Sequence, residues 1–362
     1  MGTLVFIIVL SILVIVHEMG HFIVAKSLGI KVERFAIGFG PKIFGKILRD
    51  TEFLVCLIPL GGYVKMAGDE REECKGEKEE FYSKAVGLRS LVVIAGPVVN
   101  YIFAFLCFCI VFFAGYPAVT TQIGELVDDY PAMQAGFAVN DKILSIDSNQ
   151  MNSWEDVQKY ISNSKGAELD VLVMRGNKKK NISLAPISMA SENIFGQKIE
   201  SRVVGIRSKE EIVLLRYGVV ESIAKAAEKL KDITFTTYKA LYLMVTGAMS
   251  AKDAVTGPIG IFYIIKKAAS MGFSYVMYIM AVISASLAIF NLLPFPVLDG
   301  GHLLLFGIEK IKGKPLSRRV DEIINRIGFS LIICLAVFVF YTDFVRYGIF
   351  DKIVQFWHYL GF

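Results

Sequence analysis

Two histidines flank a glutamate in a pattern that can hold and use a metal ion, His17-Glu18-Met19-Gly20-His21. On an α-helix His17 and His21 are one turn apart, roughly 6 Å along the axis, so both imidazoles face the same way. Glu18 beside them is placed to take a proton from a water molecule at that metal. The alternative is a helix whose histidines are buried in the core and hydrogen-bonded there, without a metal. In a chain with four histidines, chance produces this pattern on the order of one per cent of the time.

The position of this pattern matters as much as its composition. It lies in an apolar run that extends from Leu4 to Ala25. Ionisable groups inside a membrane-length apolar helix are expensive, and they usually mark a functional site. The run therefore favours a metal site within a membrane span.

A second stretch contains residues that could take part in catalysis or metal binding, Asn291-Leu-Leu-Pro-Phe-Pro-Val-Leu-Asp299-Gly-Gly-His302. Pro-x-Pro cannot continue a helix, so the chain is expected to unwind at membrane depth, where such breaks usually line a cavity. Asp299 is a natural carboxylate ligand there, and two glycines allow close backbone approach. The alternative is a solvated Asp299 in a loop that ends a helix, and His302 is expected to be structural rather than a fourth ligand.

The whole chain is too apolar for an ordinary soluble protein, with 362 residues, 54% hydrophobic content and a mean hydropathy of +0.53. A membrane span needs about 20 mostly apolar residues. Four segments qualify: 3–28, 90–115, 273–293 and 327–345. The first has no positive n-region and no small-residue cleavage site, so we expect it to be retained rather than removed as a signal peptide.

Charge and cysteine placement give the expected orientation. The net charge of +5 is unevenly spread. Loop 29–89 carries eleven Lys/Arg and loop 308–326 carries six, so the positive-inside rule assigns both loops to the cytosol. The N-terminus and the long segment 116–272 are then outside, and the charge reflects topology rather than nucleic-acid binding. Several of the five cysteines lie within spans, so no structural disulfide is expected.

The loop after the first span is predicted to contain structure of its own. Residues 51–60 and 61–66 are typical of two short strands around a Pro/Gly turn. Their apolar character suggests a hairpin that enters the membrane beside the metal, the alternative being an ordinary cytosolic hairpin. The mixed charges of 69–80 are expected to be solvated. In the second span, Gly96-Pro97 and the buried polar Asn100 are equally compatible with packing and with function.

Segment 116–188 has the alternating pattern of a small domain with half-buried strands. Ser153-x-x-Asp156 begins a short helix within it, and Gly176-Asn177 is a hairpin-turn candidate. The order of elements resembles a PDZ domain. Residues 189–215 are expected to be a polar connector that ends in a strand. The helical pattern of 219–243 fits either the outer membrane surface or packing on the domain.

Taken together, the HExxH span, Gly-Pro-x-x-Asn, the PDZ-like segment and Asn-x-x-Pro-x-Pro-x-Leu-Asp-Gly-Gly-His resemble the site-2 proteases, most closely the regulator of sigma-E protease branch. The resemblance covers essentially the whole chain. It implies Zn2+ held by His17, His21 and Asp299, with Glu18 as the catalytic base. It further implies an edge strand near the cleft at Gly61-Gly62-Tyr63, with Asn291 bonding the substrate or oxyanion. The best-known members carry two tandem PDZ domains, whereas this chain has room for one.

The expected fold is a polytopic α-helical membrane protein with about four transmembrane helices, a cytosolic-side β-hairpin region and an inserted extracytoplasmic α+β PDZ domain. The predicted segments are 1–28 (span 1), 29–89 (cytosolic loop), 90–115 (span 2), 116–188 (PDZ domain), 189–272 (connector and amphipathic helix), 273–307 (span 3 with its break), 308–326 (cytosolic loop), 327–345 (span 4) and 346–362 (tail).

The expected function is intramembrane zinc endopeptidase in the bacterial cytoplasmic (inner) membrane, with the active site toward the cytosolic side. The resemblance implies single-span substrates such as anti-sigma factors or signal-peptide remnants, within the lipid bilayer and without nucleic acid. A serine protease would need a Ser–His pair apart from the metal motif, and an aspartyl protease would need a second intramembrane Asp. The remaining alternative is a scaffold that binds peptide C-termini through its PDZ domain, and an intact Glu18 argues against it.

Overall fold

A computed structural model describes residues 2–193, 197–250, 252 and 255–348. The chain divides into two compact units, which are described separately. The first contains Met1–Ile110, Ile223–Leu241 and Ala251–Phe362; the second contains Val111–Ser222 and Tyr242–Ser250. The predicted tail, 346–362, lies outside the described residues from position 349 onward.

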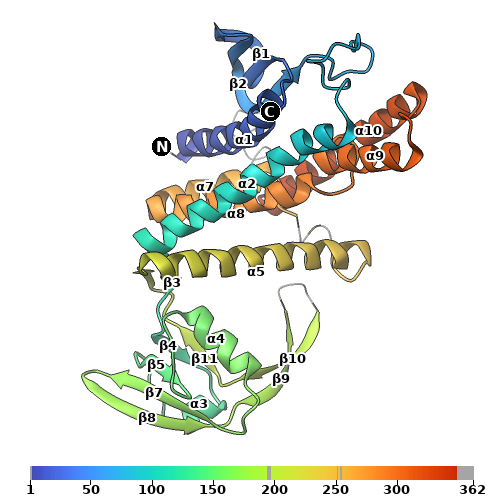
Figure 1. Cartoon of the computed structure of the whole chain (residues 1–362). Coiled ribbons are helices and arrows are strands. Elements are labelled where there is room, and N and C mark those ends of the chain that lie inside the picture. Colours follow the sequence, from blue (N-terminus) through green and yellow to red (C-terminus); the bar gives the residue numbers. More distant parts are fainter. Residues whose placement is uncertain (1, 194–196, 251, 253–254, 349–362) are drawn as a thin grey trace, which may run out of the picture. The chain divides into compact units, whose positions relative to one another are not determined.

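Helices dominate the first unit, as the long apolar runs predict (Figure 1). Helices α2 and α5 also extend into the second unit. The helices are α1 (Gly2–Ser27), α2 (Val86–Ala114), α5 (Val219–Val245), α7 (Pro258–Met271), α8 (Phe273–Asn291), α9 (Asp299–Lys312) and α10 (Arg318–Arg346). Among the described residues, four helices are long and apolar enough to cross a membrane: α1, α2, α8 and residues 322–346 of α10. These correspond to the four predicted spans.

The loop after α1 folds as two long strands, β1 (Val32–Leu48) and β2 (Thr51–Met66), beside α1 (Figure 1). The sequence predicted two short strands, 51–60 and 61–66, around a Pro/Gly turn. The structure assigns both segments to β2, and 52–55 and 62–65 pair with 34–37 in opposite directions, so the chain reverses between Val55 and Gly62. The turn that joins β1 to β2, which was not predicted, lies at Arg49-Asp50, where Arg49 has a φ of 55°. Gly61 has a φ of 111°, a conformation that favours glycine.

The strand register places Gly62–Met66 at a sheet edge. Residues 34–37 of β1 lie opposite 62–65, and they also lie opposite 52–55, which in turn pair with 44–47. Within the described part of the chain, Gly62–Met66 has a partner on one side only. On its other side the N–H of Met66 donates to Asp69 Oδ2 at 2.9 Å. The part of this edge that can pair with an added strand is therefore Gly62–Lys65.

Helices α1 and α2 cross closely because glycines meet there. A Cβ at Gly20 would lie 2.5 Å from the carbonyl oxygen of Ala95 and 3.0 Å from the Cα of Gly96. Small residues at a crossing let two membrane helices approach through their backbones. This contact brings α2 up to the histidine-bearing face of α1.

The second unit is an α+β domain around an apolar core that includes Ile146, Val157 and Val173. Helix α4 (Trp154–Asn163) begins with a complete capping box between Ser153 and Asp156, as predicted. The other elements are β3 (Tyr116–Val119), β4 (Ile123–Leu126), α3 (Pro131–Gln134), β5 (Lys142–Ile146), β6 (Asn149–Gln150), β7 (Leu169–Arg175) and β8 (Lys178–Leu184). The sheet order is β6-β5-β7-β8.

This domain does not end at residue 188. The predicted polar connector instead forms a hairpin of β9 (Ile187–Glu192) and β10 (Lys198–Val203). Strand β11 (Ile206–Ser208) then pairs with β4, and β12 (Ile212–Leu215) pairs with β3. The alternation within 189–215 was too short and polar to identify these strands, because their partners lie far back in the sequence.

Candidate active site

Three predicted ligands converge in the first unit. The Nε2 atoms of His17 and His21 are 3.2 Å apart. Asp299 Oδ2 lies 3.3 Å from His17 Nε2, and Asp299 Oδ1 lies 3.7 Å from His21 Nε2. One ligand atom from each residue lies within 4.8 Å of the others. The three side chains are largely buried, with exposures of 12–17%.

These atoms fit a tetrahedral metal ion. Zinc bonds of about 2.1 Å separate neighbouring ligand atoms by about 3.4 Å, close to the separations of 3.2, 3.3 and 3.7 Å found here. Asp299 Oδ2 is buried without a hydrogen-bond partner. A buried carboxylate oxygen that faces two imidazole nitrogens needs a cation or proton between them. His21 Nδ1 donates to the carbonyl of Val92 at 2.9 Å, which leaves its Nε2 lone pair available.

Asp299 reaches this position because the third span breaks before it. Helix α8 ends at Asn291, and α9 begins at Asp299. A Cβ at Gly300 would lie 2.3 Å from the carbonyl oxygens of Leu292 and Leu293. The short connection therefore folds tightly under the start of α9, which explains why glycine follows the aspartate. An acidic residue in the first turn of a helix is also favoured by the helix dipole.

Gly96 on α2 lies directly against both histidine rings. A Cβ there would lie 2.3 Å from His21 Nε2 and 2.8 Å from His17 Cε1. One turn further along α2, the carboxamide nitrogen of Asn100 lies 3.2 Å from His17 Nδ1. The sequence left packing and function open for both residues, and the structure places both directly against the histidines.

A cavity of about 620 Å³ opens over the three converging residues. Its lining includes four more residues singled out from the sequence: Glu18, Tyr63, Asn291 and His302. The predicted edge strand runs along it, and a Cβ at Gly62 would lie 3.5 Å from Glu18 Cγ. Gly61 turns the chain just before this edge, and a Cβ there would lie 2.1 Å from the ring of Phe39.

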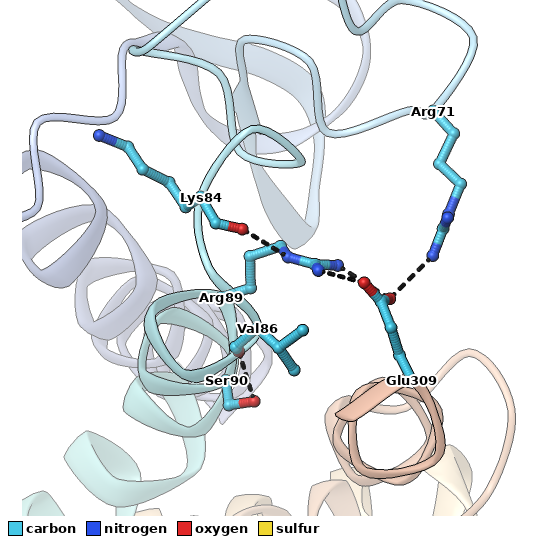
Figure 2. Close-up of polar contacts among 6 residues, drawn as sticks. All are labelled: Arg71, Lys84, Val86, Arg89, Ser90 and Glu309. Atoms are coloured by element: carbon cyan, nitrogen blue, oxygen red, sulfur yellow. Dashed lines mark hydrogen bonds and ion pairs between the residues drawn. The ribbon is translucent and has the colours of Figure 1, made fainter. Parts of the chain in front are cut away.

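An ion-pair cluster holds one wall of this cavity (Figure 2). Arg89 on α2 and Arg71 in the preceding loop both contact the carboxylate of Glu309 on α9, at 2.6 and 3.1 Å. Tyr82, which lines the cavity, lies against both guanidinium groups, and Phe306 lies against that of Arg89. The cluster links the loop, α2 and α9. Sequence reasoning missed it because lone charges near span ends are common.

The run 69–80 is not simply solvated, and this expectation was wrong at Glu80. Its side chain is buried and accepts hydrogen bonds from the backbone N–H groups of Lys75, Gly76 and Glu77. The bond from Lys75 is the main cause that lowers the pKa of Glu80 to about 2. The carboxylate therefore organises the loop around itself.

A membrane-length helix that carries His-Glu-x-x-His, with an aspartate from a second, broken helical segment beside the histidines, is the arrangement of a metalloprotease site. The sequence matches the model of Peptidase family M50 over residues 5–335. The chain therefore belongs to Peptidase family M50, the site-2 protease family.

Curated relatives agree over nearly the whole chain. A Mesorhizobium japonicum protein provisionally named as a zinc metalloprotease is 33% identical, covering 95% of this chain and 98% of its own length. The regulator of sigma E protease of Haemophilus influenzae is 32% identical, and the match covers 94% of this chain and 98% of that protein. The zinc metalloprotease RasP of Oceanobacillus iheyensis is 29% identical, and the match again covers 94% of this chain and 98% of that protein.

Solved structures similar to part of the chain include the PDZ domain of an SdrC-like protein from Listeria monocytogenes. It is 21% identical and covers 25% of this chain and 86% of its own, with a TM-score of 0.20.

Family and relatives establish the class of enzyme. The chain is a zinc metalloendopeptidase of the site-2 protease type, and zinc is its cofactor. Its four apolar helices and its family make it a multi-pass protein of the inner membrane.

Proposed function

We propose that this protease cleaves single-span membrane proteins within or near their transmembrane helix. The observation that carries the proposal is the convergence of His17, His21 and Asp299, from the membrane-length helix α1 and the break after α8, within 4.8 Å. In this proposal the three side chains hold the zinc ion. A peptide bond must then enter the membrane-embedded part of the protein to be cut.

Zinc, when bound, makes water more acidic and polarises a carbonyl group. Glu18 follows His17 on α1 and lines the same cavity, so its carboxylate accepts the proton of the attacking water and passes it to the leaving amine. Asn291, at the end of α8 in the cavity wall, donates a hydrogen bond to the substrate carbonyl or the oxyanion.

The edge strand Gly62–Met66 binds the substrate in extended form. Peptide bonds in a transmembrane helix are shielded by their own hydrogen bonds, so the helix must unwind before cleavage. Pairing with a strand edge replaces the lost bonds. The register leaves one side of Gly62–Lys65 without a strand partner among the described residues, and Tyr63 on this strand lines the cavity.

The Lys/Arg-rich loops 29–89 and 308–326 support an active site toward the cytosolic side and an extracytoplasmic second unit. The relative from Haemophilus influenzae is named for sigma E regulation. By analogy, the substrates of this chain include anti-sigma factors or the remnants of signal peptides. We assign the second unit as a single PDZ domain.

A peptide-binding role for that domain has its own support. A cavity of about 540 Å³ lies between α4 and β11, lined by Trp154, Gln158, Ile206 and Arg207. Strand β11 pairs with β4 alone among the described strands. An extended segment can add to such an edge. This groove would recruit substrates to the protease, or serve alone if the chain were a scaffold.

Two variants test the proposal. Glu18→Gln should retain zinc and lose cleavage of a single-span substrate in detergent or liposomes, whereas a scaffold would lose nothing. Asp299→Ala should lose most of the roughly one zinc per chain expected of a catalytic site, measured by metal analysis. Full zinc content in Asp299→Ala would remove this residue from the ligand set.

A further inference from the structure

Asn100 is a polar side chain buried inside the membrane-length helix α2. It is 0% exposed, and it follows Gly96 by one helical turn, so both residues face the histidines. Its backbone carbonyl accepts a hydrogen bond from Ser284 on α8 at 2.8 Å. Its carboxamide lies 3.2 Å from His17 Nδ1. A buried polar group in such a place is retained only when it has a partner.

The second histidine shows what a metal ligand needs at this position. The carbonyl of Val92 can only accept, so the Nδ1 atom of His21, 2.9 Å away, carries the proton. Its Nε2 atom then has a free lone pair that points toward Asp299. A hydrogen-bond acceptor at Nδ1 thus selects the tautomer that binds a metal through Nε2.

To bind a metal through Nε2, His17 also needs its proton on Nδ1. Asn100 is the residue placed to accept a hydrogen bond from that N–H. If the amide nitrogen of Asn100 donated to Nδ1, the proton of His17 would be on Nε2, the atom that faces Asp299. The two ends of a carboxamide have nearly the same shape, and the hydrogen-bond network decides between them. Asn100 Oδ1 has no hydrogen-bond partner in the present orientation. Turned by half a rotation, it accepts the Nδ1–H of His17 and frees Nε2.

We infer that Asn100 is a positioning residue for the zinc site: its Oδ1 accepts a hydrogen bond from His17 Nδ1–H and so fixes the tautomer and ring orientation of this ligand. The inference rests on the proposed function, in which His17 binds zinc through Nε2. Ser284 and the close crossing at Gly96 hold α2 in register, which keeps Asn100 opposite the ring. Partners of this kind typically contribute about 10- to 100-fold to metal affinity.

The first test measures zinc affinity by competition with a chelator on the full-length protein in detergent. Asn100→Leu keeps the size of the side chain and removes the acceptor, so zinc binding should weaken about 10- to 100-fold. Asn100→Asp keeps an acceptor oxygen and should bind zinc far better than Asn100→Leu. Ser90→Ala, which removes a side-chain hydrogen bond to the Val86 carbonyl elsewhere on α2, should leave zinc affinity unchanged. Wild-type affinity in Asn100→Leu, or equal losses in folded Leu and Asp variants, would overturn the inference.

A second measurement needs no variant at position 100. The chain has four histidines, so selective ¹⁵N-histidine labelling resolves the tautomer of each ring by NMR. The zinc-loaded protein should show His17 protonated at Nδ1, with assignment by His17→Ala. A proton on Nε2 of His17 would refute the role of Asn100. If His17→Ala instead retained full zinc affinity, the proposed ligand set would fail, independently of Asn100.

Discussion

Arg89 Nη2 lies 2.6 Å from Glu309 Oε1, and both side chains are almost completely buried, with exposures of 4% and 7%. Arg89 stands on α2, the helix that packs under the histidines, and Glu309 stands on α9, the helix that begins with Asp299. The pair therefore joins the two elements that must stay in register for the proposed ligands to meet. Arg71 contacts the same carboxylate of Glu309 at 3.1 Å (Figure 2). The loop that contains Arg71 and lines the cavity is therefore joined to α2 and α9.

Removal of the carboxylate should be strongly destabilising. Glu309→Ala leaves Arg89 buried without its counter-ion, for which we expect a loss of about 3–5 kcal/mol in unfolding free energy. Glu73→Ala is the matched control, because its ion pair with Lys65 is more exposed and should contribute less than about 1 kcal/mol. Thermal unfolding in detergent measures both. Equal small losses would mean that Glu309 does not hold the wall.

The same pair predicts a pH dependence. Burial alone would raise the pKa of Glu309, but the hydrogen bond and charge of Arg89, together with Arg71, outweigh it and lower the pKa below the ordinary 4.5. A carboxyl with a depressed folded-state pKa contributes its stability above the unfolded pKa and loses it as pH falls through the folded pKa. The stability gap between wild type and Glu309→Gln should therefore be constant above about pH 5 and shrink below about pH 4.3. A gap that widened on acidification would contradict this.

Glycine at position 96 should be required for metal binding. In Gly96→Ala the new methyl group would lie 2.3 Å from His21 Nε2, so the imidazoles must move and zinc content should fall strongly. Gly87→Ala, on the same helix, meets nothing within 4 Å and should keep full zinc. Metal analysis of the two folded proteins makes the comparison. Normal zinc content in Gly96→Ala would show that α2 can move away from the histidines without loss of metal binding.

The strand edge is tested by Gly62→Pro. Proline restricts φ and removes the backbone donor, and any Cβ here lies 2.8 Å from the carbonyl oxygen of Ala36. Zinc content should stay near normal while cleavage of a helical transmembrane substrate falls strongly. A substrate loosened by helix-breaking residues should recover only in part, because it still has to be positioned. Full activity of a folded Gly62→Pro on the helical substrate would rule out strand pairing.

Topology is tested by single cysteines in a cysteine-free background. Lys165 and Lys312 are both exposed, and the proposed orientation places them on opposite sides of the membrane. A membrane-impermeant thiol reagent should label Lys165→Cys in intact cells and Lys312→Cys only after lysis. The reverse pattern would invert the orientation and place the second unit inside.

Features that depend on neighbouring residues were predictable from the sequence. Helical spacing alone places His17 and His21 on one face, and apolar length alone indicates the four spans. The capping box at Ser153 is likewise contained within four residues. Asp299, the proposed zinc ligand from the third span, was expected as a candidate from the helix break, and its pairing with the first motif was implied by the resemblance to a family.

What only the tertiary structure decided are the contacts between segments distant in the chain. Asn100 meets His17 across 83 positions, and Arg89 meets Glu309 across 220. The need for glycine at position 96 comes from two rings on another helix, and strand β11 joins its sheet by pairing with β4, which lies far back in the chain. No local pattern encodes such pairs, because each depends on which helix faces or strands pack together. The sequence therefore determined the chemistry available, and the packing of α1, α2 and α9 determined which side chains surround it.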